Sequence, residues 1–157
     1  MKPILPCLAI FLLASALPAE AKLKGCYERV YDADYMDSHK NQRVRAMQMQ
    51  LGFHEANTEL KSEGDMDYLA VKFIADDRLF YAGPQCTGTT CRTERDGESL
   101  TLIETKNGLT VTLESKLRVD EEGMGGESGA DILPDADHKV FALVKVSPEH
   151  CTYFYGK

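Results

Sequence analysis

The stretch Glu98–Val119, ESLTLIETKNGLTVTLESKLRV, contains two segments of alternating apolar and polar residues, joined by Asn107-Gly108. The apolar residues that share one face are Leu100, Leu102, Leu109, Val111 and Leu113. Alternation with a period of two is typical of a half-buried strand. Asn-Gly supplies the positive φ angles that a tight two-residue hairpin turn needs. The stretch therefore predicts two antiparallel strands, 98–105 and 109–119.

The same alternation extends in both directions along the chain, and Asp96-Gly97 marks a second tight turn. We predict about eight strands, at residues 25–31, 43–54, 67–75, 78–83, 89–95, 98–105, 109–119 and 139–147. Val140–Val146 is apolar at nearly every position, which is typical of a strand that is covered on both faces. The predicted fold class is all-β, an antiparallel barrel of about eight strands with two disulfides, with a two-sheet β-sandwich as the alternative.

The first residues have the order of a secretory signal peptide. Met1-Lys2 is followed by an apolar run at 4–17, and Pro18-Ala19-Glu20-Ala21 places small residues at the −3 and −1 positions of a cleavage site. The apolar run is shorter than the roughly 20 residues that a membrane-spanning helix needs. We therefore predict a signal peptide at 1–21 and a single exported β domain at 22–157, in the periplasm or outside the cell.

The cysteines fit this location. The chain has five cysteines, and removal of the signal peptide would remove Cys7. Four cysteines in an oxidising compartment predict two disulfides, with three possible connectivities. Cys86 and Cys91 enclose four residues that a turn can close, so we predict that they pair with each other and that Cys26 pairs with Cys151.

A lipoprotein is the alternative to soluble export. Leu23-Lys24-Gly25-Cys26 loosely resembles a lipobox, in which Cys26 would be acylated. Lys24 stands where such motifs carry a small or apolar residue, and acylation of Cys26 would leave one cysteine without a partner. We therefore expect Cys26 to form a disulfide.

The charge is concentrated in one segment. The chain has 25 acidic and 18 basic residues, a net charge of −7, which disfavours nucleic acid or an anionic membrane surface as a partner. Residues 120–137 contain four glycines and no Lys or Arg, and we predict a long mobile acidic loop there. Its acidic residues, which form a possible interaction site, are Asp120, Glu121, Glu122, Glu127, Asp131, Asp135 and Asp137.

Catalytic and metal-binding motifs are absent from the sequence after the signal peptide. It has no G-x-S-x-G, H-E-x-x-H or EF-hand pattern. Asp37, Ser38 and His39 have the residue types of a triad, but triads are assembled from distant positions. Met47 and Met49 could bind Cu(I), but Leu51 and Phe53 extend the same face, so we favour a core stripe. We expect no enzyme activity, no cofactor and no metal site.

The predicted layout resembles the lipocalin-like (calycin) barrels, which are exported and carry a bridge from the C-terminal region to an early strand. Gly25-Cys26-Tyr27 stands at the place of the lipocalin G-x-W signature, with Tyr in the Trp position. The resemblance implies a barrel around a small lipophilic ligand. The segment Cys26–Tyr31 and the residues after it also resemble small uncharacterised exported bacterial proteins.

The interior of such a barrel holds either side chains or one small ligand. The residues predicted to line or fill a cavity are Met47, Met49, Phe53, Phe73 and Val111. The sequence thus predicts an exported, non-enzymatic binding module whose ligand is unknown. The alternative is a protein-interaction or inhibitor protein that engages a basic partner through 120–137.

Overall fold

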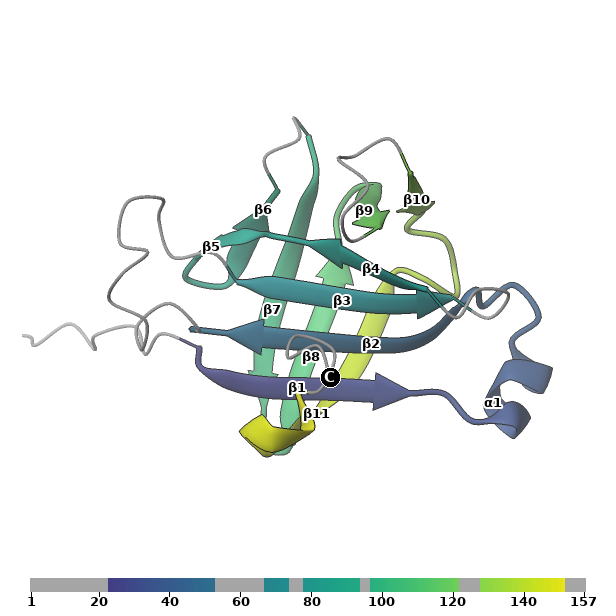
Figure 1. The fold of residues 1–157 in the computed structure, drawn as a ribbon, viewed down its shortest axis with the longest axis horizontal. Helices are drawn as coiled ribbons and strands as arrows, with labels where there is room; N and C mark the ends of the chain where they lie inside the picture. The colour runs from purple at the N-terminus through teal and green to yellow at the C-terminus, as the bar shows by residue number, and fades with distance from the viewer. Residues whose placement is uncertain (1–22, 53–66, 74–77, 94–96, 122–127, 152–157) are drawn as a thin grey trace, which may run out of the picture.

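The computed structural model describes residues 23–52, 67–73, 78–93, 97–121 and 128–151. Their strands form one antiparallel sheet of 11 strands in the order β10-β9-β4-β3-β2-β1-β11-β8-β7-β6-β5. The sheet curls into a half-barrel, in which β1 to β4 form a front layer and β7, β8 and β11 run across behind it (Figure 1). The all-β antiparallel prediction is confirmed.

The bounds of the elements follow the alternation in the sequence. The sheet from its front layer outward comprises β1 (Gly25–Val30), β2 (Val44–Leu51), β3 (Tyr68–Phe73), β4 (Leu79–Ala82), β9 (Leu117–Glu121) and β10 (Gly129–Ile132). The remaining strands are β11 (Val140–Val146), β8 (Gly108–Leu113), β7 (Ser99–Thr105), β6 (Thr90–Arg92) and β5 (Gln85–Thr87). Helix α1 (Ala33–Ser38) follows β1, and the short 3₁₀ helix η3 (Pro148–His150) follows β11.

Strand β1 joins the two layers. It pairs with β2 on one edge and with β11 on the other, so that Cys26 lies opposite both Gln50 and Val146. On the other side of the barrel the chain itself crosses between layers at the β8–β9 corner. There the Ser115 hydroxyl accepts the backbone N–H of Ser99 at 2.9 Å, which fixes the corner against β7.

Two predicted segments differ from the structure. Residues 109–119 are not one strand, because β8 ends at Leu113 and the chain turns before β9 begins at Leu117. Residues 120–137 are not one long loop, because β9 continues to Glu121 and β10 pairs back onto it, with Ile132 opposite Leu117. Basic side chains of β9 and of its neighbours lie beside the carboxylates and allow this acidic segment to form a hairpin.

The interior of the barrel is filled by side chains. The inward-facing residues of both layers form one buried cluster, which includes Tyr27 and Phe141. Among the predicted cavity residues, Met47, Met49 and Val111 are 0% exposed and Phe73 packs edge-on against Phe80 at 5.2 Å between ring centroids. Phe53 lies outside the described residues. The described members of this set therefore belong to a packed core.

The two predicted disulfides, Cys26–Cys151 and Cys86–Cys91, are both present. Because Cys26 is bonded to Cys151, its thiol is not the acylation site of a lipoprotein. Disulfides persist in oxidising compartments, so these bonds indicate a location outside the cytoplasm. The Cys26–Cys151 bond closes a loop of 125 residues, worth about 4–5 kcal/mol in the chain-entropy description.

The same bond holds the C-terminal segment against the outer face of β1 and β2. The alternation in β2 places Gln48 on the solvent side, yet its side chain is fully buried. Its Nε2 donates to the backbone carbonyl of His150 at 2.8 Å and to Glu28 Oε1 at 3.1 Å. The segment that ends at Cys151 therefore covers this part of the sheet.

Helix α1 packs beside the barrel at the end of β1 (Figure 1). The Asp32 carboxylate caps it by accepting the N–H of Tyr35 at 2.8 Å, and Tyr35 packs against the core. Tyr31 stacks on Tyr35, and burial together with the nearby Tyr35 raises the pKa of Tyr31 to about 12, although Arg29 opposes the shift. No helix in the described part of the chain is long and apolar enough to cross a membrane.

A filled interior predicts a large cost for truncating a central side chain. We expect Met49→Ala to lower the free energy of unfolding by about 2–5 kcal/mol, because it removes buried contacts and leaves a cavity. Chemical denaturation measures this cost. The exposed Val30→Ala serves as the control and should change stability by less than about 0.5 kcal/mol. A Met49→Ala cost as small as that of the control would show that Met49 borders open space.

Candidate binding site at one end of the barrel

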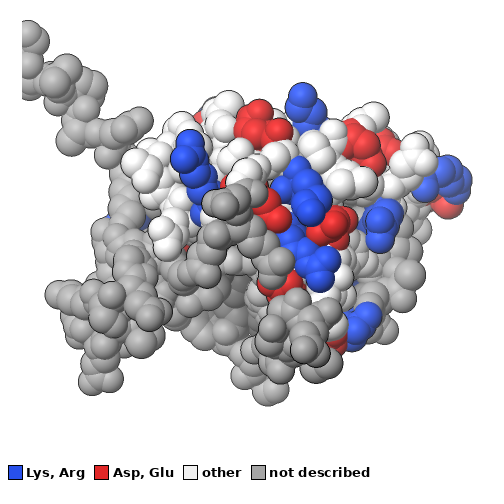
Figure 2. Space-filling view, turned by 90° about the horizontal axis from the view of Figure 1, so that it is seen from above, with Lys and Arg blue, Asp and Glu red and all other residues white. Residues whose placement is uncertain are grey.

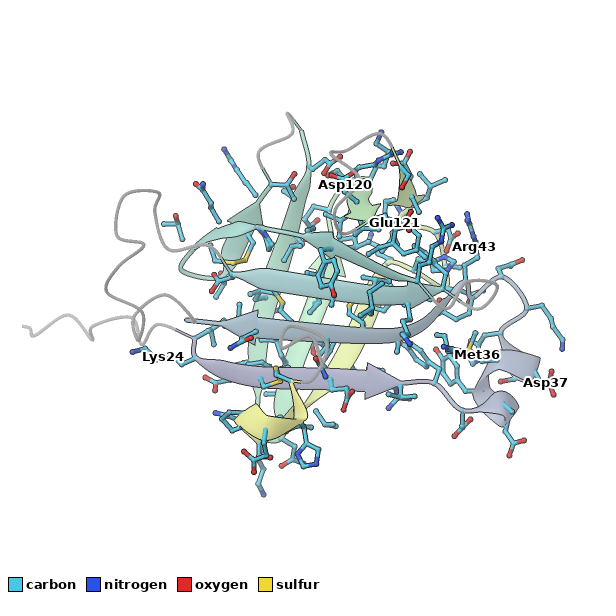
Figure 3. The ribbon with its side chains drawn as sticks, viewed as in Figure 1. Lys24, Met36, Asp37, Arg43, Asp120 and Glu121 are labelled. Carbon is cyan, nitrogen blue, oxygen red and sulfur yellow. A yellow bond between two sulfur atoms is a disulfide. The ribbon has the colours of Figure 1, made fainter. Side chains whose placement is uncertain are left out.

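A shallow hollow lies where the start of β2 meets the β9–β10 hairpin and the turn before β11. It has a volume of about 40 Å³ and is lined by Arg43, Phe73, Asp131, Ile132, Leu133, Asp135 and His138. Figure 3 shows Arg43 on the same side of the molecule as Asp120 and Glu121 of β9. Phe73, Asp131 and Asp135 were predicted as site residues from the sequence, whereas Arg43, Leu133 and His138 were not.

The floor of the hollow is apolar and its rim is charged. Phe73 is buried at the end of β3, and the Arg43 guanidinium lies 5.9 Å from the centroid of its ring. Leu133 is 54% exposed beside it, although it follows directly after the buried Ile132. An exposed arginine, an exposed leucine and carboxylates thus converge on one small depression.

A buried histidine holds this end of the barrel together. His138 is 4% exposed, its Nδ1 lies 2.7 Å from Asp135 Oδ1, and its Nε2 accepts the backbone N–H of Arg43 at 2.8 Å. Because Nε2 acts as an acceptor, this hydrogen-bond pattern assigns the proton to Nδ1, which donates to Asp135. Both ring nitrogens are therefore occupied, and neither is available as a general base.

Gln42 supports the same junction. It is almost completely buried, its Oε1 accepts the N–H of Val44 at 3.0 Å, and its Nε2 donates to the carbonyl of Asp137 at 3.1 Å. Gln42 and His138 thus tie the start of β2 to the turn that precedes β11. This polar clamp fixes the backbone that presents Arg43.

The surroundings of Asp135 shift its acid–base equilibrium. Desolvation acts to raise the pKa of Asp135, but hydrogen bonds from the His138 side chain and from the N–H groups of Asp137 and His138 outweigh it. The pKa of Asp135 therefore lies below its ordinary value of 3.8. The ionised carboxylate is the form that the clamp binds.

The Asp37-Ser38-His39 segment does not form a catalytic relay. His39 Nδ1 lies 2.9 Å from both Ser38 Oγ and the carbonyl of Tyr35, and the His39 ring stacks on Tyr35 at 3.9 Å between centroids. Asp37 pairs instead with Lys40 at 3.0 Å. The segment is the end of a short helix whose polar groups bind one another, as expected for a capped turn.

Three acidic residues of 120–137 have Lys or Arg partners from outside that segment. Ion pairs join Asp120 to Arg118 at 3.4 Å, Glu121 to Arg78 at 2.6 Å, and Asp131 to Lys116 and Arg118 at 3.6 Å each. Glu122 and Glu127 lie outside the described residues, and Asp137 is half-buried. The expectation of an uncompensated acidic loop is wrong for Asp120, Glu121 and Asp131, because their basic partners lie elsewhere in the sequence.

Figure 2 shows the consequence for the surface. Basic and acidic side chains are interleaved on this face, and neither sign forms a patch of its own among the described residues. Exposed ion pairs each contribute only about 0–1 kcal/mol to stability. Their main effect here is to cancel the field of the acidic residues.

The hollow does not have the properties of a cofactor site. Small-molecule pockets typically measure about 300–1,000 Å³, far more than this depression offers. Within the described residues, no group of three or more His, Cys, Asp or Glu side chains is placed to hold a metal ion. Met47 and Met49, considered as Cu(I) ligands, are packed in the core. The arrangement suits contact with side chains of another protein.

Comparisons of this chain with protein-family models, curated proteins and solved structures found no match. The resemblance to lipocalin-like barrels therefore remains an expectation based on layout. A function for the chain accordingly rests on the geometry of its own residues.

Loss of the His138 ring should destabilise the fold. We expect His138→Ala to lower the free energy of unfolding by about 1–3 kcal/mol, because the N–H of Arg43 would lose its buried acceptor. His150→Ala, at an exposed histidine in η3, is the matched control and should cost less than about 0.5 kcal/mol. Equal effects of the two substitutions in urea unfolding would contradict the role assigned to His138.

The lowered pKa of Asp135 predicts a pH dependence. A carboxyl group whose pKa is lower in the folded state stabilises the protein above its unfolded pKa, and this stabilisation is lost as the pH falls through the folded value. We therefore expect the stability difference between the wild type and Asp135→Asn to be constant near pH 6 and to shrink below about pH 4. Urea unfolding across this range measures it, and a difference that grows on acidification would refute the assignment.

Proposed function

We propose that the protein is an exported, non-enzymatic binding module that recognises a protein partner through the hollow around Arg43 and Leu133. The observation that carries this proposal is the filled interior. A small ligand inside the barrel would have to displace the core side chains of Met47, Met49 and Val111. Recognition is therefore assigned to the outer surface.

Two observations support export. The first residues of the sequence have the order of a signal peptide. The two disulfides fit the oxidising periplasm or the extracellular space. We propose the periplasm as the site of action.

The hollow has the composition of a protein interface. Protein interfaces have an apolar centre and a polar rim, and arginine is enriched among the residues that dominate their binding energy. Leu133 and Phe73 supply apolar surface here, and Arg43 supplies an exposed guanidinium whose backbone is held by His138. The Gln42–His138 clamp positions this group before binding, which reduces the entropy lost on association.

The ion pairs of the acidic residues in 120–137 indicate what charge the partner should have. A strongly basic partner was the alternative suggested by the acidic residues of 120–137. Asp120, Glu121 and Asp131 already bind Arg or Lys side chains of this chain. We therefore propose a partner of mixed charge, whose binding weakens only moderately when salt is added.

The proposal is tested by capture and cross-linking. A photo-reactive amino acid at position 133 of the exported protein is irradiated in periplasmic extract, and the cross-linked protein is purified for binding measurements. We expect Arg43→Glu combined with Leu133→Asp to weaken the affinity of the exported protein for this captured partner by roughly tenfold or more.

The control is Arg92→Glu, which reverses an exposed charge on β6, away from the residues that line the hollow. It should bind the captured partner like the wild type. Equal binding by all three proteins, or a lipophilic small molecule that is retained by the purified protein in place of a protein partner, would contradict the proposal.

A further inference from the structure

On the outer face of the back layer, the described residues include exposed apolar side chains beside half-buried threonines. Val140, Ala142 and Val144 point outward from β11 and are exposed. Across the sheet, Val140 aligns with Thr112 and Thr101, and Ala142 aligns with Thr110 and Ile103. We call these seven side chains, together with Val30 of β1, the outer β-face. Figure 1 shows β11, β8 and β7, which carry seven of these residues, behind the front layer.

This outer β-face concentrates exposed apolar surface. Five large apolar side chains of the described residues are at least 50% exposed, and all but Leu133 lie on it: Val30, Ile103, Val140 and Val144. A strand with one solvent-exposed face normally alternates apolar and polar residues. In contrast, β11 buries Phe141 and Leu143 in the core and exposes valines to solvent. Exposed apolar side chains gathered on one face in this way, with only threonines between them, are typical of an interaction surface.

We propose that the outer β-face binds the same face of a second copy of the chain, to form a two-fold symmetric dimer. In such a dimer each surface meets its own copy, so a charged residue near the axis would face a like charge. The outer β-face has only Val, Ile, Ala and Thr side chains. Glu28, which lies opposite Val144, is half-buried and accepts a hydrogen bond from Gln48.

The charges at the rim complement each other in this arrangement. Lys106 precedes β8 and Glu114 follows it, and both are exposed. Neither forms an ion pair with another residue that the structure describes. Consider a two-fold axis that lies in the plane of the interface and crosses β8 at right angles at its midpoint. This axis brings Lys106 of one copy toward Glu114 of the other. The same surface is thus neutral at its centre and self-complementary at its ends.

The size of the face sets the strength of the dimer. The three strands β11, β8 and β7, about 4.8 Å apart and each about seven residues long, give a flat area of roughly 330 Å² in each copy and about 660 Å² in total. This lies below the size of stable specific interfaces. The dimer should therefore be weak and reversible, with a dissociation constant of roughly 1–100 μM.

Sedimentation velocity on the exported protein, from about 1 to 500 μM, tests this proposal. We expect the wild type to shift from monomer to dimer as the concentration rises. Val144→Lys should weaken association at least tenfold, because the lysine would be buried against the apolar side chains around Val140 of the other copy. Leu133→Lys introduces the same charge at the exposed apolar residue outside the outer β-face and should leave association unchanged. Far-UV circular dichroism and thermal melting confirm that each variant is folded.

A charge exchange at the rim provides the second measurement. Lys106→Glu alone should weaken the dimer, and the double variant with Glu114→Lys should restore it. A wild type that remains monomeric at the highest concentration, or a Val144→Lys variant that associates like the wild type, would overturn the proposal. Either result leaves the partner binding assigned to Arg43 and Leu133 unaffected, because that binding is measured separately.

Discussion

Burial of one apolar face along each strand of a single continuous sheet is the constraint on which this structure depends. The sheet curls until the two layers bring these faces together, and β1 belongs to both layers through its pairing with β2 and β11. The side chains that meet inside, such as Met49 and Phe141, leave no exposed surface of their own. Because the interior is used for packing, any recognition by the described part of the chain has to take place on its outer surface.

The outer surface has three regions that differ in what covers them and in their charge. Over β1 and β2 the Cys26–Cys151 bond and the Gln48 side chain hold the C-terminal segment against the sheet. Over the β9–β10 hairpin, ion pairs cancel the acidic residues beside a small hollow. Over β11, β8 and β7 the described residues present exposed Val and Ile side chains beside half-buried threonines. We assign partners to two of these regions, the hollow beside the β9–β10 hairpin and the outer β-face.

The sequence predicts most of the fold because alternation and turn residues act locally. The hairpin between β7 and β8 and both disulfides follow from neighbouring residues or from simple counting. The predicted turn is one residue out of place, because the turn residues are Lys106 and Asn107 and neither Asn107 nor Gly108 has a positive φ. The β8–β9 corner does not, because Leu117 and Val119 continue the phase of Leu109 and Val111, so the alternation passes through the corner unchanged. The polar clamp is equally invisible in sequence, since His138 and Arg43 are separated by 95 residues. A long-range contact of this kind also buries Gln48, which the alternation in β2 assigns to the solvent side.

The central claim is that the barrel interior is packed and that recognition occurs outside it. Methyl NMR of Met47 and Met49 during titration with a long-chain fatty acid tests this claim most directly, because both methyl groups lie in the core. The account predicts that their resonances do not shift as the fatty acid is added. A saturable shift of both resonances, with a one-to-one stoichiometry, would show that the interior accepts a ligand and would contradict the account.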